Sequence, residues 1–183
     1  MGTNQTVGKG LYYLALAQIL GLLAVIPLVG PFVALAGEVI QILGIYVLSR
    51  RDIGYRMAFV GTILALVMDL LTLFVEEETG LYSLLRMVSA VANFLVVYNI
   101  CTNTSRILRG IDPVLAEKAL RIIRIYTVGT VVIVLSMMVV WIPVLNVLAA
   151  VAMVIAAIAM LVSGIMYMIF LWNSQKVLQA AGI

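Results

Sequence analysis

Apolar residues fall into long runs, and charged residues gather between those runs. Between Lys9 and Arg50 the only charged residue is Glu38, and between Arg124 and Lys176 there is none. Each of these runs is about twice the length of one membrane span, which takes about 20 residues. Pro27–Pro31 and Ile142–Asn146 mark the turn inside each run. The pattern therefore predicts two hydrophobic hairpins.

A third hairpin lies between them, around the acidic turn Glu76–Gly80. Asp112 followed by Pro113 is typical of an N-cap with proline at the first helical position, so a further helix should begin there. The chain then contains six helices in three hairpins, at about 11–28, 31–49, 54–75, 80–102, 113–141 and 144–172.

Composition places these helices in lipid. Apolar residues make up 65% of the 183 residues and charged residues only 10%, and the mean hydropathy is +1.23. Soluble domains are about half apolar and one quarter charged. Six spans leave only turns and short tails, so we predict an all-α polytopic transmembrane bundle that forms one domain over residues 1–183.

The basic residues predict the orientation, because positively charged loops stay in the cytoplasm. With both termini inside, every Lys and Arg except Arg86 falls on the cytoplasmic side of a cell membrane. A basic segment before the fifth span should attract anionic lipid headgroups. Its residues are Arg106, Arg109, Lys118, Arg121 and Arg124.

Polar residues follow a three-four spacing on the third and fourth helices. Asp69 and Arg86 are equally distant from the midpoint of their hairpin, so antiparallel helices bring them to one depth, about 10 Å inside the outer boundary. A lone charge near the membrane centre costs about 3 kcal/mol, which favours pairing. The pair either fixes the register of the hairpin or belongs to a polar pathway or binding site. The candidate residues are Glu38, Gln41, Thr62, Asp69, Thr72, Arg86, Ser89 and Asn93.

Glu38 is the other ionisable group at depth, about twelve residues from Arg50. No basic residue lies at that depth on the helices adjacent in sequence. Because burial disfavours the charged carboxylate, Glu38 is either protonated or paired with a distant group, and it could take a proton- or cation-linked role. Gln18 and Gln41 are symmetric about the first outer turn, which allows an amide contact between them.

Small residues on the sixth helix form a continuous stripe that allows close helix packing. They serve either the bundle itself or a contact with a second copy or a partner membrane subunit. The stripe is Ala149, Ala152, Ala156, Ala159 and Ser163. The tripeptide Val60-Gly61-Thr62 recurs as Val128-Gly129-Thr130. This short recurrence is compatible with an internal repeat.

Aromatic residues near the predicted boundaries indicate an interfacial belt. They are Tyr12, Tyr13, Tyr46, Tyr55, Tyr98, Tyr126, Tyr167, Trp141 and Trp172.

Leu43-Gly44-Ile45-Tyr46-Val47-Leu48-Ser49, followed by Tyr55 and Ala58-Phe59, resembles a pattern in small multi-pass bacterial membrane proteins without an assigned function. The likeness covers one helix and a loop and implies no chemistry. The six-helix layout with both termini inside is also similar to the substrate-binding subunits of energy-coupling-factor transporters. Those subunits carry an alanine-rich coupling motif on the first helix, where this chain has Ala17-Gln18-Ile19-Leu20-Gly21.

The chain has no histidine and one cysteine, Cys101. We find no metal-ligand cluster, no nucleophile with a base and no phosphate-binding loop, so we expect no enzyme, no metal, no cofactor and no nucleic-acid partner. Two function classes remain. One is a bundle that binds or passes a small solute or ion; the other is a structural or assembly subunit of a membrane complex.

Overall fold

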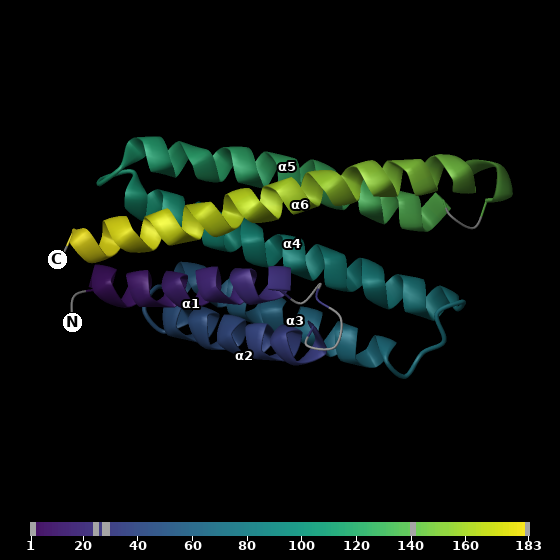
Figure 1. Cartoon of the computed structure of the whole chain (residues 1–183), viewed down its shortest axis with the longest axis horizontal. Helices are drawn as coiled ribbons and strands as arrows, with labels where there is room; N and C mark the ends of the chain where they lie inside the picture. The colour runs from purple at the N-terminus through teal and green to yellow at the C-terminus, as the bar shows by residue number, and fades with distance from the viewer. Residues whose placement is uncertain (1–2, 24–25, 27–29, 140–141, 182–183) are drawn as a thin grey trace.

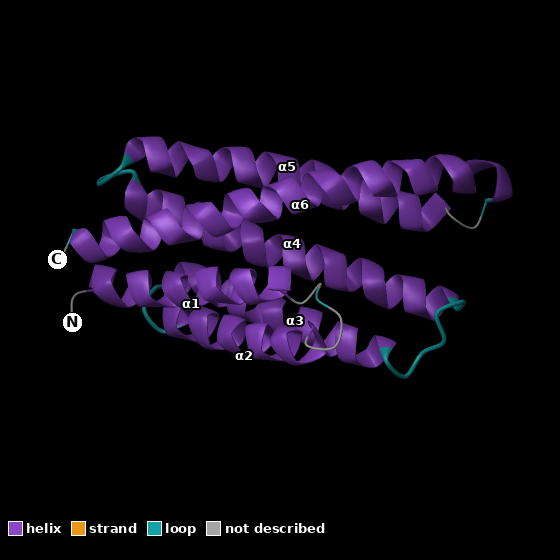
Figure 2. Ribbon diagram, in the orientation of Figure 1, coloured by secondary structure: helices purple, strands orange, loops and turns teal. Residues whose placement is uncertain are grey.

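The computed structural model describes residues 3–23, 26, 30–139 and 142–181, and it confirms an all-α fold. The described residues form six α-helices and one short 3₁₀ helix, without a strand among them (Figure 2). These are α1 (Thr3–Leu23), α2 (Gly30–Ser49), η1 (Ile53–Tyr55), α3 (Arg56–Thr72), α4 (Gly80–Leu108), α5 (Pro113–Val139) and α6 (Pro143–Ala180). All six α-helices are long and apolar enough to cross a membrane, as in a multi-pass membrane protein.

Four helix ends within the described ranges lie three or more residues from the predicted ones, and one of them is that of α4, which continues to Leu108 instead of ending near residue 102. α1 begins at Thr3 and α6 continues to Ala180, because the polar end segments pack on each other through Val7 and Leu178, which are fully buried. α3 ends at Thr72, whose hydroxyl bonds the Asp69 carbonyl oxygen at 2.6 Å. The first predicted helix ends near residue 28 and the fifth near residue 141. Both of these ends, and residues 27–29 of the predicted first turn, lie outside the described residues.

The helices form a closed ring in chain order. The three predicted hairpins make the most extensive contacts, α4 packs on α5, and α1 packs on α6 to close the ring. The contact between α2 and α3 is the least extensive of the six around the ring. The start of α1 and the end of α6 lie at one end of the bundle, and α1 and α2 stop well short of the far end that α5 and α6 reach (Figure 1).

Glycines let α1 and α2 approach closely. A Cβ atom at Gly44 would lie 3.0 Å from the carbonyl oxygen of Gly10 and 3.0 Å from Cβ of Tyr13. Helices in lipid gain stability chiefly from such close packing, because there is no hydrophobic force between them. These glycines therefore set the distance between the two helices.

A polar cluster joins η1 to α4 at the end of the bundle that holds the termini. Asp52 accepts a hydrogen bond from the Gly54 amide at 2.7 Å and pairs with Arg106 at 2.5 Å. The amide nitrogen of Asn103 donates to the Gly54 carbonyl at 2.8 Å, and the hydroxyls of Tyr55 and Thr104 are 3.0 Å apart. The cluster fixes where α3 begins relative to α4.

Replacing Gly44 by Leu should separate α1 from α2 and cost about 1–3 kcal/mol of stability, the usual range for overpacking. The measurement is the melting temperature of the purified protein in detergent. Gly21→Leu is the matched control on α1, since among the described residues no heavy atom lies within 4 Å of an added Cβ there. Equal melting temperatures for the two variants would contradict the close approach at Gly44.

Candidate functional site

Asp69 is the centre of a polar cluster between α3 and α4. Ser89 donates a hydrogen bond to Oδ1 of Asp69 at 2.7 Å, and Nδ2 of Asn93 lies 3.4 Å from the Ser89 hydroxyl oxygen. Nη1 of Arg86 lies 4.0 Å from the same Asp69 oxygen. The two helices therefore bring these four predicted residues together, as their spacing requires.

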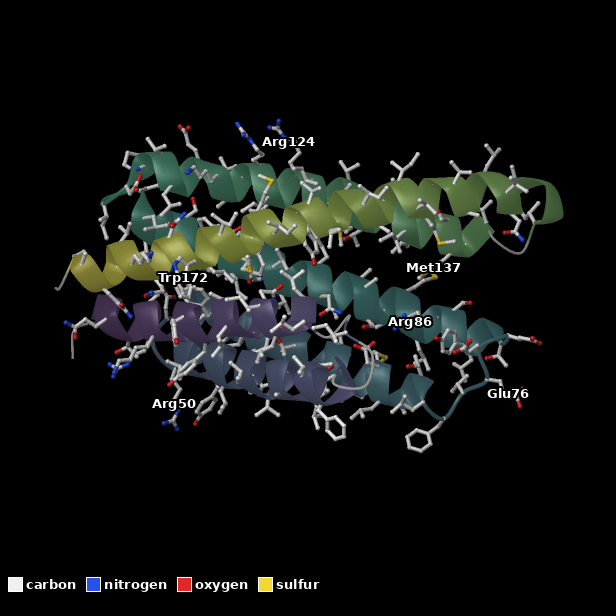
Figure 3. All side chains as sticks on the ribbon, viewed as in Figure 1. Arg50, Glu76, Arg86, Arg124, Met137 and Trp172 are labelled. Carbon is white, nitrogen blue, oxygen red and sulfur yellow. The ribbon has the colours of Figure 1, made fainter. Side chains whose placement is uncertain are left out.

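The Asp69–Arg86 pair lies at the edge of the bundle. In the isolated protein the Asp69 side chain is 41% exposed and the Arg86 side chain 50%. Part of the pair therefore faces lipid or headgroups. Arg86 lies in the half of the bundle opposite the termini, with Glu76, whereas Arg50 and Arg124 lie in the terminal half (Figure 3). At 4.0 Å the ion pair is loose, so its contribution to stability is small compared with that of a short, buried pair.

A small cavity of about 60 Å³ lies between α2, α3 and α4. It is bordered by five of the predicted polar residues, Glu38, Gln41, Thr62, Asp69 and Asn93. The carboxyl groups of Glu38 and Asp69 thus border one cavity from opposite sides of the α2–α3 seam. Two carboxylates in lipid surroundings repel each other unless a proton or a cation is shared between them.

A larger cavity of about 270 Å³ lies at the centre of the ring, between α1, α2, α4, α5 and α6. Gln41 and Asn93 border both this central cavity and the small one. Gln18 also borders the central cavity, and among the described residues no direct hydrogen bond joins it to Gln41. The predicted polar face therefore continues from the α2–α3 seam into the middle of the bundle.

Besides Ser89, two predicted site residues lie outside both cavities. The hydroxyl of Thr72 is used at the end of α3, where it donates to the Asp69 carbonyl oxygen. Arg86 reaches Asp69 from the far end, with its guanidinium carbon 6.0 Å from the centre of the Tyr82 ring. Both residues act on the site through Asp69.

Three further polar residues border the central cavity, and the sequence pattern does not predict them there: Tyr126, Thr130 and Tyr167. Tyr167 is 3% exposed and Tyr55 is fully buried, so the aromatic-belt prediction is wrong for both. Trp141 lies outside the described residues. The recurrence of Val-Gly-Thr was the one signal in the sequence for Thr130, since Thr62 in the first copy borders the small cavity.

The stripe of small residues on α6 faces α5. Ala149, Ala156 and Ser163 are buried, and the Ser163 hydroxyl lies 3.5 Å from the Ile122 carbonyl oxygen. Ala152 and Ala159 border an open apolar groove of about 530 Å³ between the two helices. The stripe therefore serves the bundle and leaves a groove on its lipid-facing side.

All five residues of the basic segment are exposed, and one of them is paired. Arg106 is the partner of Asp52; the other four are Arg109, Lys118, Arg121 and Arg124. These four remain accessible to headgroups.

The arrangement offers hydrogen bonds and carboxylates to a small species inside the bundle. Among the described residues, no group of three or more His, Cys, Asp or Glu side chains could hold a metal ion. No protein-family model, curated protein or solved structure matches this chain.

Proposed function

We propose that this membrane protein binds a small solute or ion on its internal polar face, or lets it pass across the membrane there. The observation that carries the proposal is the small cavity that Glu38 and Asp69 border across the α2–α3 seam. This seam is the least extensive contact of the ring, so it can widen at the lowest cost in packing. A monovalent cation, a proton or Na⁺, would relieve the repulsion between the two carboxylates.

The proposed orientation has both termini in the cytoplasm of a cell membrane. It is supported by the loop at Arg50–Arg51, which lies at the same end as the termini, whereas Glu76 lies at the other end (Figures 1 and 3). Positively charged loops remain inside. The exposed residues Arg109, Lys118, Arg121 and Arg124 would then meet the anionic inner leaflet.

A membrane-impermeant maleimide applied to intact cells should label Glu77→Cys at once and Arg109→Cys only after permeabilisation. Both positions are exposed, and the native thiol of Cys101 is fully buried and therefore gives a low background. The opposite labelling pattern would show that the orientation is reversed.

Replacing Glu38 by Gln, or Asp69 by Asn, should abolish cation flux. In liposomes that contain the protein, proton entry is followed with an internal pH dye and Na⁺ entry with the radioactive ion. We expect each variant to lower the rate by about tenfold or more, because a hydrogen bond or contact to a charged group contributes about 1.5–3 kcal/mol. Glu77→Gln removes one exposed carboxylate from the turn and should leave the rate unchanged.

The charge-swapped variant with Asp69→Arg and Arg86→Asp separates this role from a structural one. If the pair only fixes the register of α3 and α4, the folded double variant should conduct like the wild type. If the carboxylate serves the cavity, the folded double variant should lose flux. A wild-type rate equal to that of protein-free liposomes for both cations would refute cation passage.

The alternative function is that of an assembly subunit of a membrane complex. The specific observation in its favour is the open groove between α5 and α6, which has Ala152, Ala156 and Ala159 on its α6 side. A helix from a second copy or from a partner could enter such a groove with close backbone contact.

Ala152→Phe should fill this groove and convert an oligomer into a monomer, as measured by mass photometry or light scattering in lipid nanodiscs. Val154→Phe is the control, since Val154 is 61% exposed and does not border the groove. A wild-type protein that is already monomeric in nanodiscs would argue against self-assembly through this groove.

A further inference from the structure

We propose that the central cavity binds a small, uncharged ring molecule that carries an amide-like pair of hydrogen-bond donor and acceptor groups. This goes beyond the proposed cation site, because it assigns a second, uncharged ligand to the neutral part of the same internal polar face. The volume of about 270 Å³ is close to the lower end of the range for small-molecule pockets, about 300–1,000 Å³. The size therefore fits a single ring with one substituent rather than a larger ligand.

The buried hydroxyl of Thr130 lacks a hydrogen-bond partner among the described residues. Thr130 is 6% exposed and borders the cavity, and its Oγ1 atom is buried without a partner among the described residues. Hydroxyl groups in membrane helices commonly bond the carbonyl four residues back. Thr62 and Thr127 do so here, at 2.9 and 2.8 Å. An orphan hydroxyl is costly in the interior, and rotation of the Thr130 side chain toward the cavity that it borders would let a group in the cavity satisfy it.

The rest of the polar lining consists of uncharged groups. Gln18, Gln41 and Asn93 supply amides that both donate and accept, and Tyr126 and Tyr167 supply hydroxyls and aromatic rings. No Asp, Glu, Lys or Arg is among the described residues that line this cavity. A charged ligand would have no counter-charge there and would lose its hydration, which is costly at membrane depth. The lining therefore selects against ions.

The aromatic side chains favour a ring over a flexible chain. Tyr167 is almost fully buried and borders the cavity together with Tyr126. A flat ring can pack against tyrosine faces or edges, and such pairs add attraction beyond burial of area. The amide side chains of the lining then favour an amide as the polar substituent of the ligand. Such a substituent can donate a hydrogen bond to one side chain and accept one from another.

Benzamide, benzoate and benzamidine test the proposal, because they share one ring and nearly one size but differ in charge. Binding to the full-length protein in nanodiscs is measured by saturation-transfer NMR and by calorimetry. We expect benzamide to bind at least about tenfold more tightly than either charged analogue, given the cost of an unpaired charge inside a membrane. Equal binding of the three would mean that the cavity does not discriminate by charge, and no binding of any would mean that it takes no such ring molecule; either result would overturn the proposal.

Thr130→Val, which keeps the shape and removes the hydroxyl, should weaken benzamide binding about fivefold, the effect of one neutral hydrogen bond. It should not lower the melting temperature of the free protein, because it removes an orphan polar group. Thr127→Val, on the same helix, removes a hydroxyl that is already bonded to its own backbone and should leave binding unchanged.

Ala90→Leu adds volume at the cavity wall and should block benzamide while every polar group remains. If Thr130→Val and Ala90→Leu both fold and bind benzamide as the wild type does, the ligand sits elsewhere and the proposal is wrong. Different results would refute the cation hypothesis and the present inference. Loss of flux in Glu38→Gln with no benzamide binding would refute only the present inference, whereas Thr130-dependent benzamide binding without any cation flux would refute only cation passage.

Discussion

The packing of α1 on α6 is the contact on which the interior of this protein depends. It joins the first helix to the last, and without it the six helices would form an open row with the Gln18 side of α1 turned to lipid. The contact is apolar and tight: Val7, Leu11 and Leu178 are at most 1% exposed, and a Cβ at Gly8 would lie 3.1 Å from the Gln179 side chain. Closure of the ring turns side chains that lipid could not solvate into the lining of an enclosed space.

The polar groups that line the interior change from the α2–α3 seam to the centre of the ring. At the α2–α3 seam, where helix packing is least extensive, the lining contains two carboxyl groups. Toward the centre it contains amides and hydroxyls without charge. Gln41 and Asn93 belong to both linings. The bundle therefore has one cavity with charged groups and one without, and the two share these two amide side chains.

The sequence predicted those features that depend on neighbouring segments of chain. Charges at the turns predict the hairpins, and the symmetry of Asp69 and Arg86 about the acidic turn predicts that they lie at one depth; in the structure they are 4.0 Å apart. The sequence could not reveal which faces of α5 and α6 turn inward, because that depends on packing between hairpins. Tyr167 was therefore interpreted as an interfacial anchor although it is buried, and Thr130 was noticed only as part of a repeated tripeptide. The polar ends of α1 and α6 were left out of the helices for the same reason, since each is helical where it packs on the other.

The closing contact also sets an order of events during synthesis. The hairpins α1–α2, α3–α4 and α5–α6 can each form as soon as their own two helices have entered the membrane. α6 (Pro143–Ala180), which packs against α1, is translated after the other five helices. Until then the amides of Gln18 and Gln41 lack their enclosure, and a nascent chain that stalls before α6 exposes polar side chains to lipid. The completed six-helix ring instead turns these amides toward the central cavity.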